Sequence, residues 1–255
     1  GRSHVRPLRS DHLAAWSRTF AVQGSWNYTT MVGTGVAYAL LPLLRRIYAG
    51  DPVRLRESVE RAMRPFNGHP YLCAMAVAAL GRLEQDEVDP ATIEKFRLAL
   101  RGPLGTVGDR AVWGQWRPVC ALVGIMAFLL GASPGWSVAG FLVLYNVGHI
   151  AVRAWAYITG WQAGLEVGRL LKGAWLERWA EKIWPLNILL TGAVTLLLAA
   201  AVVEQAALSL APAALLGMGV VGALLAFRFP RQGGRMATVL LVIAPLLWLV
   251  GGLVG

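Results

Sequence analysis

The sequence predicts an all-α integral membrane protein, with amphipathic and re-entrant or discontinuous helices in the first half and about three regular transmembrane helices at the C-terminus. Of the 255 residues, 56% are hydrophobic and 15% are charged, whereas a soluble domain carries about 25% charge. The apolar residues gather in long runs toward the C-terminus, as a lipid environment requires. Glycine and proline interrupt the helical signals of the first half.

Three apolar runs near the C-terminus are long enough to cross a bilayer, which takes about 20 helical residues. They cover residues 186–203, 208–227 and 236–254. The connection at residues 228–235 holds three arginines and no acid, so the positive-inside rule places it in the cytoplasm. These runs divide the chain into a predicted N-terminal and core region, residues 1–184, and a C-terminal transmembrane region, residues 185–255.

Local signals predict shorter helices before these spans. Asp51 and Asp89 are each followed by proline, and this order is typical of a helix that the aspartate caps. Three tryptophans between residues 175 and 184 predict a helix at the membrane interface just before the first span. Helices are expected at residues 31–48, 53–64, 71–83, 90–100 and 119–130, and the third and fifth of these are too short to cross a bilayer easily.

Two stretches rich in glycine and proline interrupt these helices. Residues 66–70 read FNGHP, and residues 102–109 read GPLGTVGD, which is not expected to form a straight helix. Non-helical backbone inside a membrane is tolerated only where protein buries it or a cavity uses it. We therefore expect re-entrant or discontinuous helices that meet near a site. The residues assigned to these loops are Gly68, Pro70, Gly102, Pro103, Gly105 and Gly108.

Charge and motif content exclude several function classes. The net charge of +10 comes without a basic stripe interleaved with aromatic residues, so we expect it to face anionic lipid headgroups and not nucleic acid. The glycines lack the Lys-Ser/Thr pair of a phosphate-binding loop. Cys73 and Cys120 have no metal or redox spacing and are expected to be buried thiols. With no nucleophile–base pair, metal cluster or cofactor motif, we expect no catalytic residue, metal or cofactor.

Four motifs in order carry a family resemblance. They are QGSWNY at residues 23–28, FNGHP at 66–70, GPLGTVGD at 102–109, and WG at 113–114 followed by RP at 117–118. Their order and spacing resemble the IID components of the mannose/fructose/sorbose family of sugar phosphotransferase systems. The resemblance extends from about residue 20 to residue 173, and more loosely to the end of the chain.

The resemblance implies a non-catalytic, multi-pass subunit of the bacterial inner membrane. It implies that a IID chain pairs with a IIC membrane subunit to translocate a hexose of the mannose, fructose, sorbose or glucosamine class. It also implies that IIA and IIB partners, separate or joined as IIAB, carry the phosphoryl group, and that IIB phosphorylates the arriving sugar. A trimer of IIC/IID pairs is expected.

Three positions depart from the family pattern. The family usually has threonine where this chain has Gly68, an apolar residue where it has Arg101, and a small residue where it has Arg110. The two added arginines beside the second glycine stretch leave an alternative open. In that alternative the chain is a divergent IID-like scaffold or regulatory protein that no longer transports sugar.

Five polar or aromatic side chains are candidates for sugar binding: Asn67, His69, Asp109, Trp26 and Asn27. Amides and carboxylates suit sugar recognition, because they can form hydrogen bonds with hydroxyl groups. Each candidate has a structural alternative as well. Asn67 could stabilise its turn, His69 could bond to backbone, and Asp109 could cap a helix beginning at Arg110 or pair with an arginine.

Overall fold

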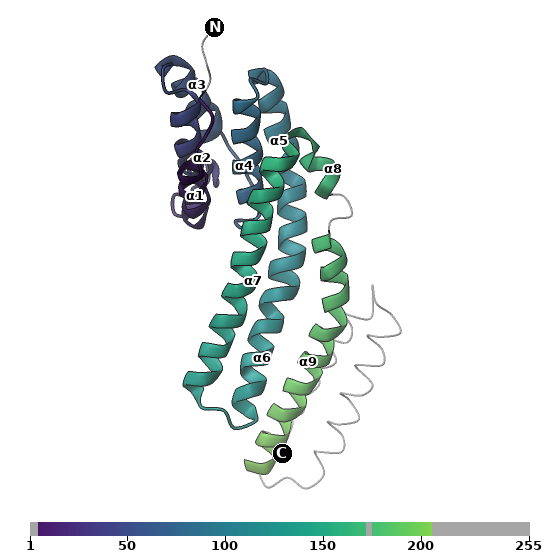
Figure 1. The fold of residues 1–255 in the computed structure, drawn as a ribbon. Coiled ribbons are helices and arrows are strands. Elements are labelled where there is room, and N and C mark those ends of the chain that lie inside the picture. Colours follow the sequence, from purple (N-terminus) through teal and green to yellow (C-terminus); the bar gives the residue numbers. More distant parts are fainter. Residues whose placement is uncertain (1–4, 172–174, 206–255) are drawn as a thin grey trace. The chain divides into compact units, whose positions relative to one another are not determined.

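The computed structural model describes residues 5–171 and 175–205, and these form helices joined by short connections (Figure 1). No strand forms in these ranges, where the only bridges are the isolated pairs Asn27–Met31 and Met31–Phe66. The helices are α1 (Arg9–Arg18), α2 (Gly33–Ile47), α3 (Pro52–Met63), α4 (Cys73–Gln85), α5 (Pro90–Gly108), α6 (Arg117–Leu129), α7 (Pro134–Ala163), α8 (Val167–Leu171) and α9 (Trp175–Gln205). Short 3-10 segments, η1 (Thr19–Ala21) and η3 (Gly164–Glu166), and one π-helical segment, η2 (Asp109–Trp116), complete the described chain.

Two helices begin where the aspartate–proline pairs predict. The side chain of Asp51 accepts a hydrogen bond from the backbone N–H of Arg54 at 3.1 Å, and α3 begins at Pro52. Asp89 accepts from the backbone N–H of Thr92 at 2.8 Å, and α5 begins at Pro90. Each carboxylate satisfies a backbone donor that has no partner within the first helical turn, so the capping prediction is confirmed.

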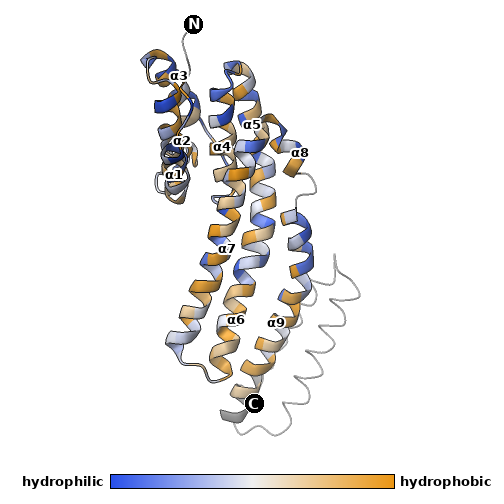
Figure 2. Ribbon diagram, viewed as in Figure 1, coloured by the Kyte–Doolittle hydropathy of each residue, from blue (hydrophilic) through white to orange (hydrophobic). Residues whose placement is uncertain are grey.

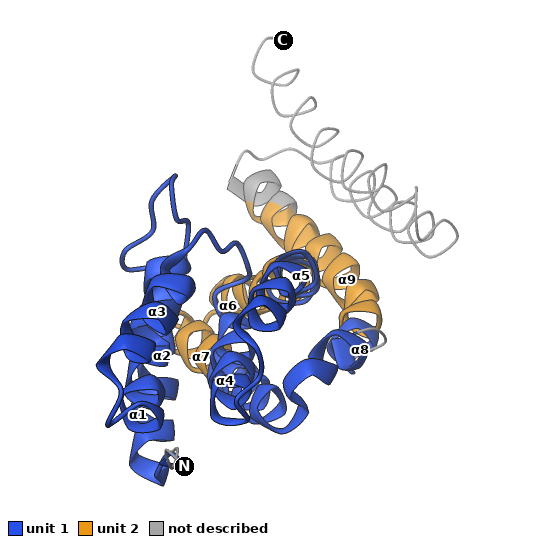
Figure 3. Ribbon diagram, turned by 90° about the horizontal axis from the view of Figure 1, so that it is seen from above, with its two compact units in different colours: residues 1–112, 147–178 blue, residues 113–146, 179–255 orange. Residues whose placement is uncertain are grey.

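The chain divides into two compact units (Figure 3). Unit 1 comprises the described residues up to 112 together with 147–178, and unit 2 comprises 113–146 together with the described residues from 179 onward. This division follows contacts in space, whereas the boundary predicted at residue 185 follows hydropathy along the chain. That predicted boundary stays a prediction.

The core of unit 1 is built around α4, whose residues 73–81 are all buried. At two positions in unit 1, a glycine lets the backbones of two segments come into direct contact. A Cβ on Gly160 would lie 2.3 Å from the carbonyl oxygen of Met75, so α7 and α4 are in direct backbone contact. A Cβ on Gly35 would meet the carbonyl oxygen of Val22 at 1.9 Å, which packs α2 equally closely on the segment after η1. No larger residue fits these two positions without moving backbone.

Three helical stretches are long and apolar enough to cross a membrane: Pro90–Leu129, Pro134–Leu171 and Trp175–Leu198. Figure 2 shows predominantly apolar residues along α6, the first part of α7 and the second part of α9. Large apolar side chains are exposed there, including Leu130, Trp136 and Leu189, which are 69%, 78% and 63% exposed. Side chains of this size facing outward indicate a lipid or protein environment. The predicted fold class, an all-α integral membrane protein, is confirmed.

The expected break at residues 102–109 is wrong as a prediction of secondary structure. Helix α5 does not end near residue 100 but runs through Pro103 to Gly108 and continues directly into η2 and α6. Residues 119–130, judged too short to cross a bilayer, are therefore the end of a 40-residue helical stretch. The physical reason is that lipid offers no hydrogen-bond partners, so the backbone stays helical despite unfavourable glycine and proline propensities.

The predictions for the C-terminal region are tested only in part. The expected interface helix and the run at residues 186–203 are one continuous helix, α9, which includes Pro185. The prediction of a separate interface helix is therefore wrong. The runs at 208–227 and 236–254 and the arginine-rich connection at 228–235 lie outside the described residues.

Candidate functional site

The first two family motifs lie in connections that pair with each other in unit 1. We call them the α1–α2 loop, residues 22–32, and the α3–α4 loop, residues 64–72. The backbone N–H of Val32 donates to the carbonyl of Phe66, and the N–H of Phe66 donates to the carbonyl of Thr30, both at 3.1 Å. Between them Met31 adopts φ 54°, a left-handed conformation that is strained for a residue with a side chain. The pairing therefore brings motifs about 40 residues apart into one place.

Asn27 organises the α1–α2 loop. Its side-chain oxygen accepts from the backbone N–H groups of Thr29 and Thr30 at 2.9 and 2.8 Å, and its amide donates to the Thr30 hydroxyl at 2.7 Å. This is the turn-forming role that asparagine commonly takes. Trp26 is half exposed, with its ring edge against Tyr28. Both predicted site residues are exposed, but the side-chain amide of Asn27 already bonds within the loop.

The α3–α4 loop presents Asn67 at the surface and buries His69. Asn67 is exposed, whereas His69 is 1% exposed. The Nδ1 atom of His69 accepts from the backbone N–H of Tyr71 at 3.2 Å. Burial, with smaller contributions from the neighbouring Arg153 and His149, lowers the pKa of His69 to about 3. His69 is therefore neutral at physiological pH and supports the loop from inside.

The third family motif packs directly against this loop. A Cβ on Gly108 would lie 2.2 Å from the Cβ of His69, so the His69 side chain packs directly against this glycine of α5. A Cβ on Gly68 would lie 3.7 Å from the Cβ of Leu104, one turn earlier on the same helix. The expectation that the two glycine-containing stretches meet is confirmed, although the second of them is helical.

The other residues of the third motif have looser surroundings. A Cβ on Gly102 or Gly105 would meet no described atom within 4 Å, so close packing explains Gly108 but neither of these. Asp109 is exposed and follows the last residue of α5. Because the helix continues through it, Asp109 does not cap a helix that begins at Arg110, and that interpretation is wrong. Its role in sugar binding stays a prediction.

Arg153, on α7, fastens the C-terminal end of the α3–α4 loop and was not predicted. Its side chain is 2% exposed and donates through Nη1 to the carbonyl oxygens of Thr19 and, at 3.3 Å, Pro70. Its guanidinium also lies over the rings of Phe20 and Tyr71, with 4.5 and 5.0 Å to the centroids. A buried arginine in an apolar helix is costly unless it bonds or functions, and that residue type in that setting is the signal that could have identified it.

His149 completes this buried cluster from the same helix. It accepts from Nε of Arg153 at 3.2 Å, and its ring stacks on Tyr71 with centroids 4.0 Å apart and planes 16° from parallel. The ring of Phe20 lies 5.3 Å away. Three segments of unit 1 are therefore joined through two polar side chains and two aromatic rings.

A second buried arginine, Arg97 on α5, holds the N-terminal end of the same loop. It is 1% exposed and donates through Nη1 to the carbonyl oxygens of Arg64 and Pro65 at 3.1 and 3.2 Å. The carboxylate of Glu94, one turn earlier, accepts from its Nε and Nη2 at 3.1 Å each. Between the two arginine contacts lie residues 66–69, and Asn67 is the exposed residue among them.

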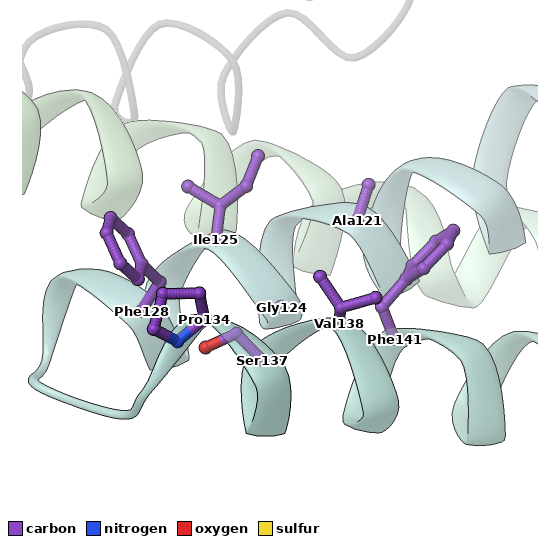
Figure 4. Close-up of a pocket in the computed structure, with 8 residues that line it drawn as sticks. All are labelled: Ala121, Gly124, Ile125, Phe128, Pro134, Ser137, Val138 and Phe141. Carbon is purple, nitrogen blue, oxygen red and sulfur yellow. The ribbon is translucent and has the colours of Figure 1, made fainter.

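Two cavities lie away from the predicted residues. One, of about 540 Å³, lies in unit 1 between α1 and α7. The other, of about 450 Å³, lies in unit 2 between α6 and α7 and is lined by apolar groups and Ser137 (Figure 4). Within the part of the chain that the structure describes, no cluster of histidine, cysteine, aspartate or glutamate could hold a metal ion. The amide and aromatic side chains of the loops can offer hydrogen bonds and aromatic contact.

Together the fold and these loops define a helical membrane protein in which the second and third sequence motifs meet at a buried contact and the loop of the first pairs with that of the second. The family described as "PTS system mannose/fructose/sorbose family IID component" matches residues 8–210. The chain belongs to this family, and the resemblance on which the sequence interpretation depends is confirmed.

Relatives with known names support the same assignment. The chain is 28% identical over 191 residues to the mannose-specific EIID component of Escherichia coli K12, covering 73% of this chain and 67% of that protein. It is 25% identical over 197 residues to the fructose permease IID component of Bacillus subtilis, covering 74% and 70%. The sorbose-specific EIID component of Klebsiella pneumoniae is 25% identical over 191 residues, covering 72% and 68%.

Solved structures show the same fold. The structure of the mannose transporter ManYZ with microcin E492 matches with a TM-score of 0.59 and 26% identity, over 74% of this chain and 70% of that chain. A second structure, described as a membrane protein, matches with a TM-score of 0.67 and 27% identity over the same shares. The chain is thus an EIID-type membrane component of a sugar phosphotransferase system.

Proposed function

We propose that this chain pairs with a IIC subunit in the bacterial inner membrane, as a multi-pass protein, to form a permease that translocates a hexose while a IIB partner phosphorylates it. The observation that carries the proposal is the contact between His69 and Gly108, which joins the second and third family motifs beside the loop that contains the first. The named relatives are specific for mannose, fructose or sorbose, which supports a substrate of that class. The chain itself takes no catalytic part, because IIA and IIB, separate or fused, carry the phosphoryl group.

Sugar contact from this chain is proposed to centre on the α3–α4 loop. Asn67 is exposed between two arginine contacts that fix the loop at either end, so its amide is held without being used internally by a described bond. Held in this way, an amide can donate to and accept from sugar hydroxyls without a large ordering cost. Trp26, Asn27, His69 and Asp109 are proposed to shape or support the same surface.

Uptake measurements test the proposal as a whole. Deleting the gene in a strain without a paralogue is expected to abolish phosphorylation-coupled uptake of the labelled hexose, and a plasmid copy is expected to restore it. The protein is expected in the inner-membrane fraction and to co-purify with IIC as a trimer of pairs. Normal uptake after the deletion would overturn the transport function.

Binding measurements on the purified IIC/IID complex test the site. Asn67→Ala and Asp109→Asn are expected to weaken hexose binding, each by about tenfold for one lost charge-assisted or neutral hydrogen bond. The matched control is Asn146→Ala, an exposed asparagine whose amide bonds to the carbonyl of Leu142 on its own helix. If neither site variant differs from the control, the site lies on IIC.

A second candidate function is a scaffold or regulatory protein that keeps the fold without transport. The observation that favours it is the pair of arginines that depart from the family pattern, Arg101 on α5, which is half buried, and Arg110 in η2, which is exposed. A reconstituted IIC/IID complex that assembles but binds no hexose would favour this function. Recovery of binding in Arg101→Leu or Arg110→Ala would identify the arginines as the cause.

A further inference from the structure

The cavity between α1 and α7 in unit 1 belongs to no part of the proposed sugar site. Its volume of about 540 Å³ is within the range of about 300–1,000 Å³ that is typical of small-molecule sites. The aliphatic part of its lining comes from Leu13 on α1 and from Ala154 and Ile158 on α7. Leu13 and Ile158 are 61% and 55% exposed. Two large apolar side chains of the lining are therefore accessible from outside, as the entry of a flexible apolar ligand requires.

The position of the cavity along the chain suggests the membrane interface. Its α7 residues lie between 154 and 162, toward the C-terminal end of the candidate span Pro134–Leu171. Three of the lining residues are Trp16, Tyr157 and Trp161. Tryptophan and tyrosine gather at the depth of lipid headgroups, where one side of the ring is apolar and the other meets polar groups.

One lining residue has an unmet hydrogen-bonding capacity. The indole Nε1 of Trp16 is buried and has no acceptor among the described residues. A buried N–H that lacks an acceptor is costly, so an oxygen-bearing ligand in the cavity would relieve that cost. Phospholipids carry ester and phosphate oxygens at the level where their acyl chains begin. They therefore combine an apolar chain for the apolar lining with an oxygen that can accept from Trp16.

The polar end of the cavity carries positive charge. Arg9 lines the cavity and is exposed, and a second exposed arginine, Arg6, lies three residues earlier in the chain. The nearby acid, Asp11, lies 3.8 Å from the guanidinium of Arg46, which offsets its charge. His12 is held by the hydroxyl of Tyr157 at 3.1 Å, and burial lowers its pKa, so it adds no charge at neutral pH. An anionic group of a ligand is therefore favoured at this end of the cavity.

We propose that this cavity binds an anionic phospholipid, with an acyl chain between Leu13 and Ile158 and the phosphate near Arg9. The lipid would hold α1 against α7 and so tie the N-terminal helix to the membrane. The proposal does not depend on the transport function. Lipid binding is measured without sugar, so the failure of one leaves the other intact.

Native mass spectrometry of the delipidated full-length chain, in complex with IIC where it co-purifies, tests the proposal. Phosphatidylglycerol and phosphatidylcholine of the same acyl chains are added at equal concentrations. The expected result is a preference for phosphatidylglycerol of about fivefold, since one arginine near the surface contributes about that factor. Equal binding of the two lipids would overturn the proposal, as would displacement of phosphatidylglycerol by inorganic phosphate alone or by IIC.

Three variants locate the site. Ala154→Phe fills the cavity and is expected to reduce binding of both lipids, whereas Arg9→Gln is expected to remove only the preference for phosphatidylglycerol. The matched control is Arg56→Gln on α3, whose side chain is 82% exposed and pairs with Glu60 on its own helix. If Arg9→Gln changes the preference no more than this control does, the phosphate does not bind at Arg9.

A second measurement covers the case in which Ala154→Phe fails to fold. Lipids brominated on the acyl chain are expected to quench less tryptophan fluorescence in Trp16→Phe than in Trp116→Phe, because Trp16 lines the cavity, whereas Trp116 is half-buried in unit 2. Each is compared with the unsubstituted chain in the same detergent. Equal loss of quenching in the two variants would place the lipid elsewhere.

Discussion

The two ends of the α3–α4 loop are fastened by arginines that are equally buried but differently partnered. Arg97 is compensated by Glu94 on its own helix, so it joins the N-terminal end of the loop to α5 alone. Arg153 bonds to the carbonyls of Thr19 and Pro70, which lie 134 and 83 residues away in sequence. One end thus depends on a local ion pair, whereas the other depends on a charge that joins three separate segments.

This difference predicts unequal costs of removing the two side chains. The largest effect is expected for Arg153→Met, which leaves buried carbonyls without donors and removes the cation from two aromatic faces. We expect the free energy of unfolding to fall by about 3–5 kcal/mol. Denaturation in detergent micelles measures it, and Arg153→Lys is expected to recover part of the loss. If Arg153→Met lowers the free energy of unfolding by less than Arg97→Met does, Arg153 is not the more important of the two fastenings.

Arg97→Met is expected to cost less, about 2–3 kcal/mol. It also leaves two carbonyl groups without a donor, but its partner Glu94 is 20% exposed at the side chain and can be hydrated once the arginine is gone. The same denaturation experiment measures it. Glu94→Gln is the informative companion, because it keeps the carbonyl contacts and removes only the ion pair. A larger loss in Glu94→Gln than in Arg97→Met would show that the ion pair dominates this end.

Gly108→Ala tests the contact between the loop and α5. A Cβ at this position would overlap His69, and we expect a cost of about 1–3 kcal/mol from overpacking. Gly105→Ala is the matched control on the same helix, since its Cβ would meet open space. That substitution is expected to stabilise the helix by about 0.5–1 kcal/mol. If the two substitutions change stability equally, the contact with His69 does not cause the cost of Gly108→Ala.

At pH values near neutral, the smallest effect expected is a dependence of stability on pH. The pKa of His69 is lowered to about 3 in the folded protein, whereas an unfolded histidine titrates near its ordinary value of 6.5. Between these values the unfolded state binds more protons, so stability decreases as the pH falls from 6.5 toward 3, by at most about 1.4 kcal/mol per pH unit. His69→Asn is expected to flatten unfolding curves measured across this range. An unchanged slope would place the titrating group elsewhere.

Local rules predicted the parts of the fold that depend on neighbouring residues. Asp51 and Asp89 cap their helices because a carboxylate followed by proline satisfies the first turn whatever the rest of the chain does. The break at residues 66–70 is equally local. The helix through Pro103 was not predicted, because the helix propensities of glycine and proline apply to helices in water. In lipid, a long apolar helix retains its backbone hydrogen bonds.

The candidate site divides in the same way. The motifs placed Asn67 and His69 in one loop, but nothing near them in sequence indicates Arg153, whose partners come from α7, η1 and the loop itself. The sequence does not indicate the role of Arg97 either, because its spacing from Glu94 is that of an ordinary surface ion pair on a helix. Residue type and spacing therefore predict the loop, whereas the packing of distant segments shows which side chains hold it.

The burial of Cys73 has a practical consequence. Its Sγ lies 3.7 Å from the carbonyl of Gly68, it is 0% exposed, and burial raises the pKa of its thiol to about 12. Cys120 is also 0% exposed. Maleimide and methanethiosulfonate reagents attack exposed thiolates, so neither native cysteine is expected to react while the protein is folded. A single probe attached through Asn67→Cys could then report on the loop in the unaltered background.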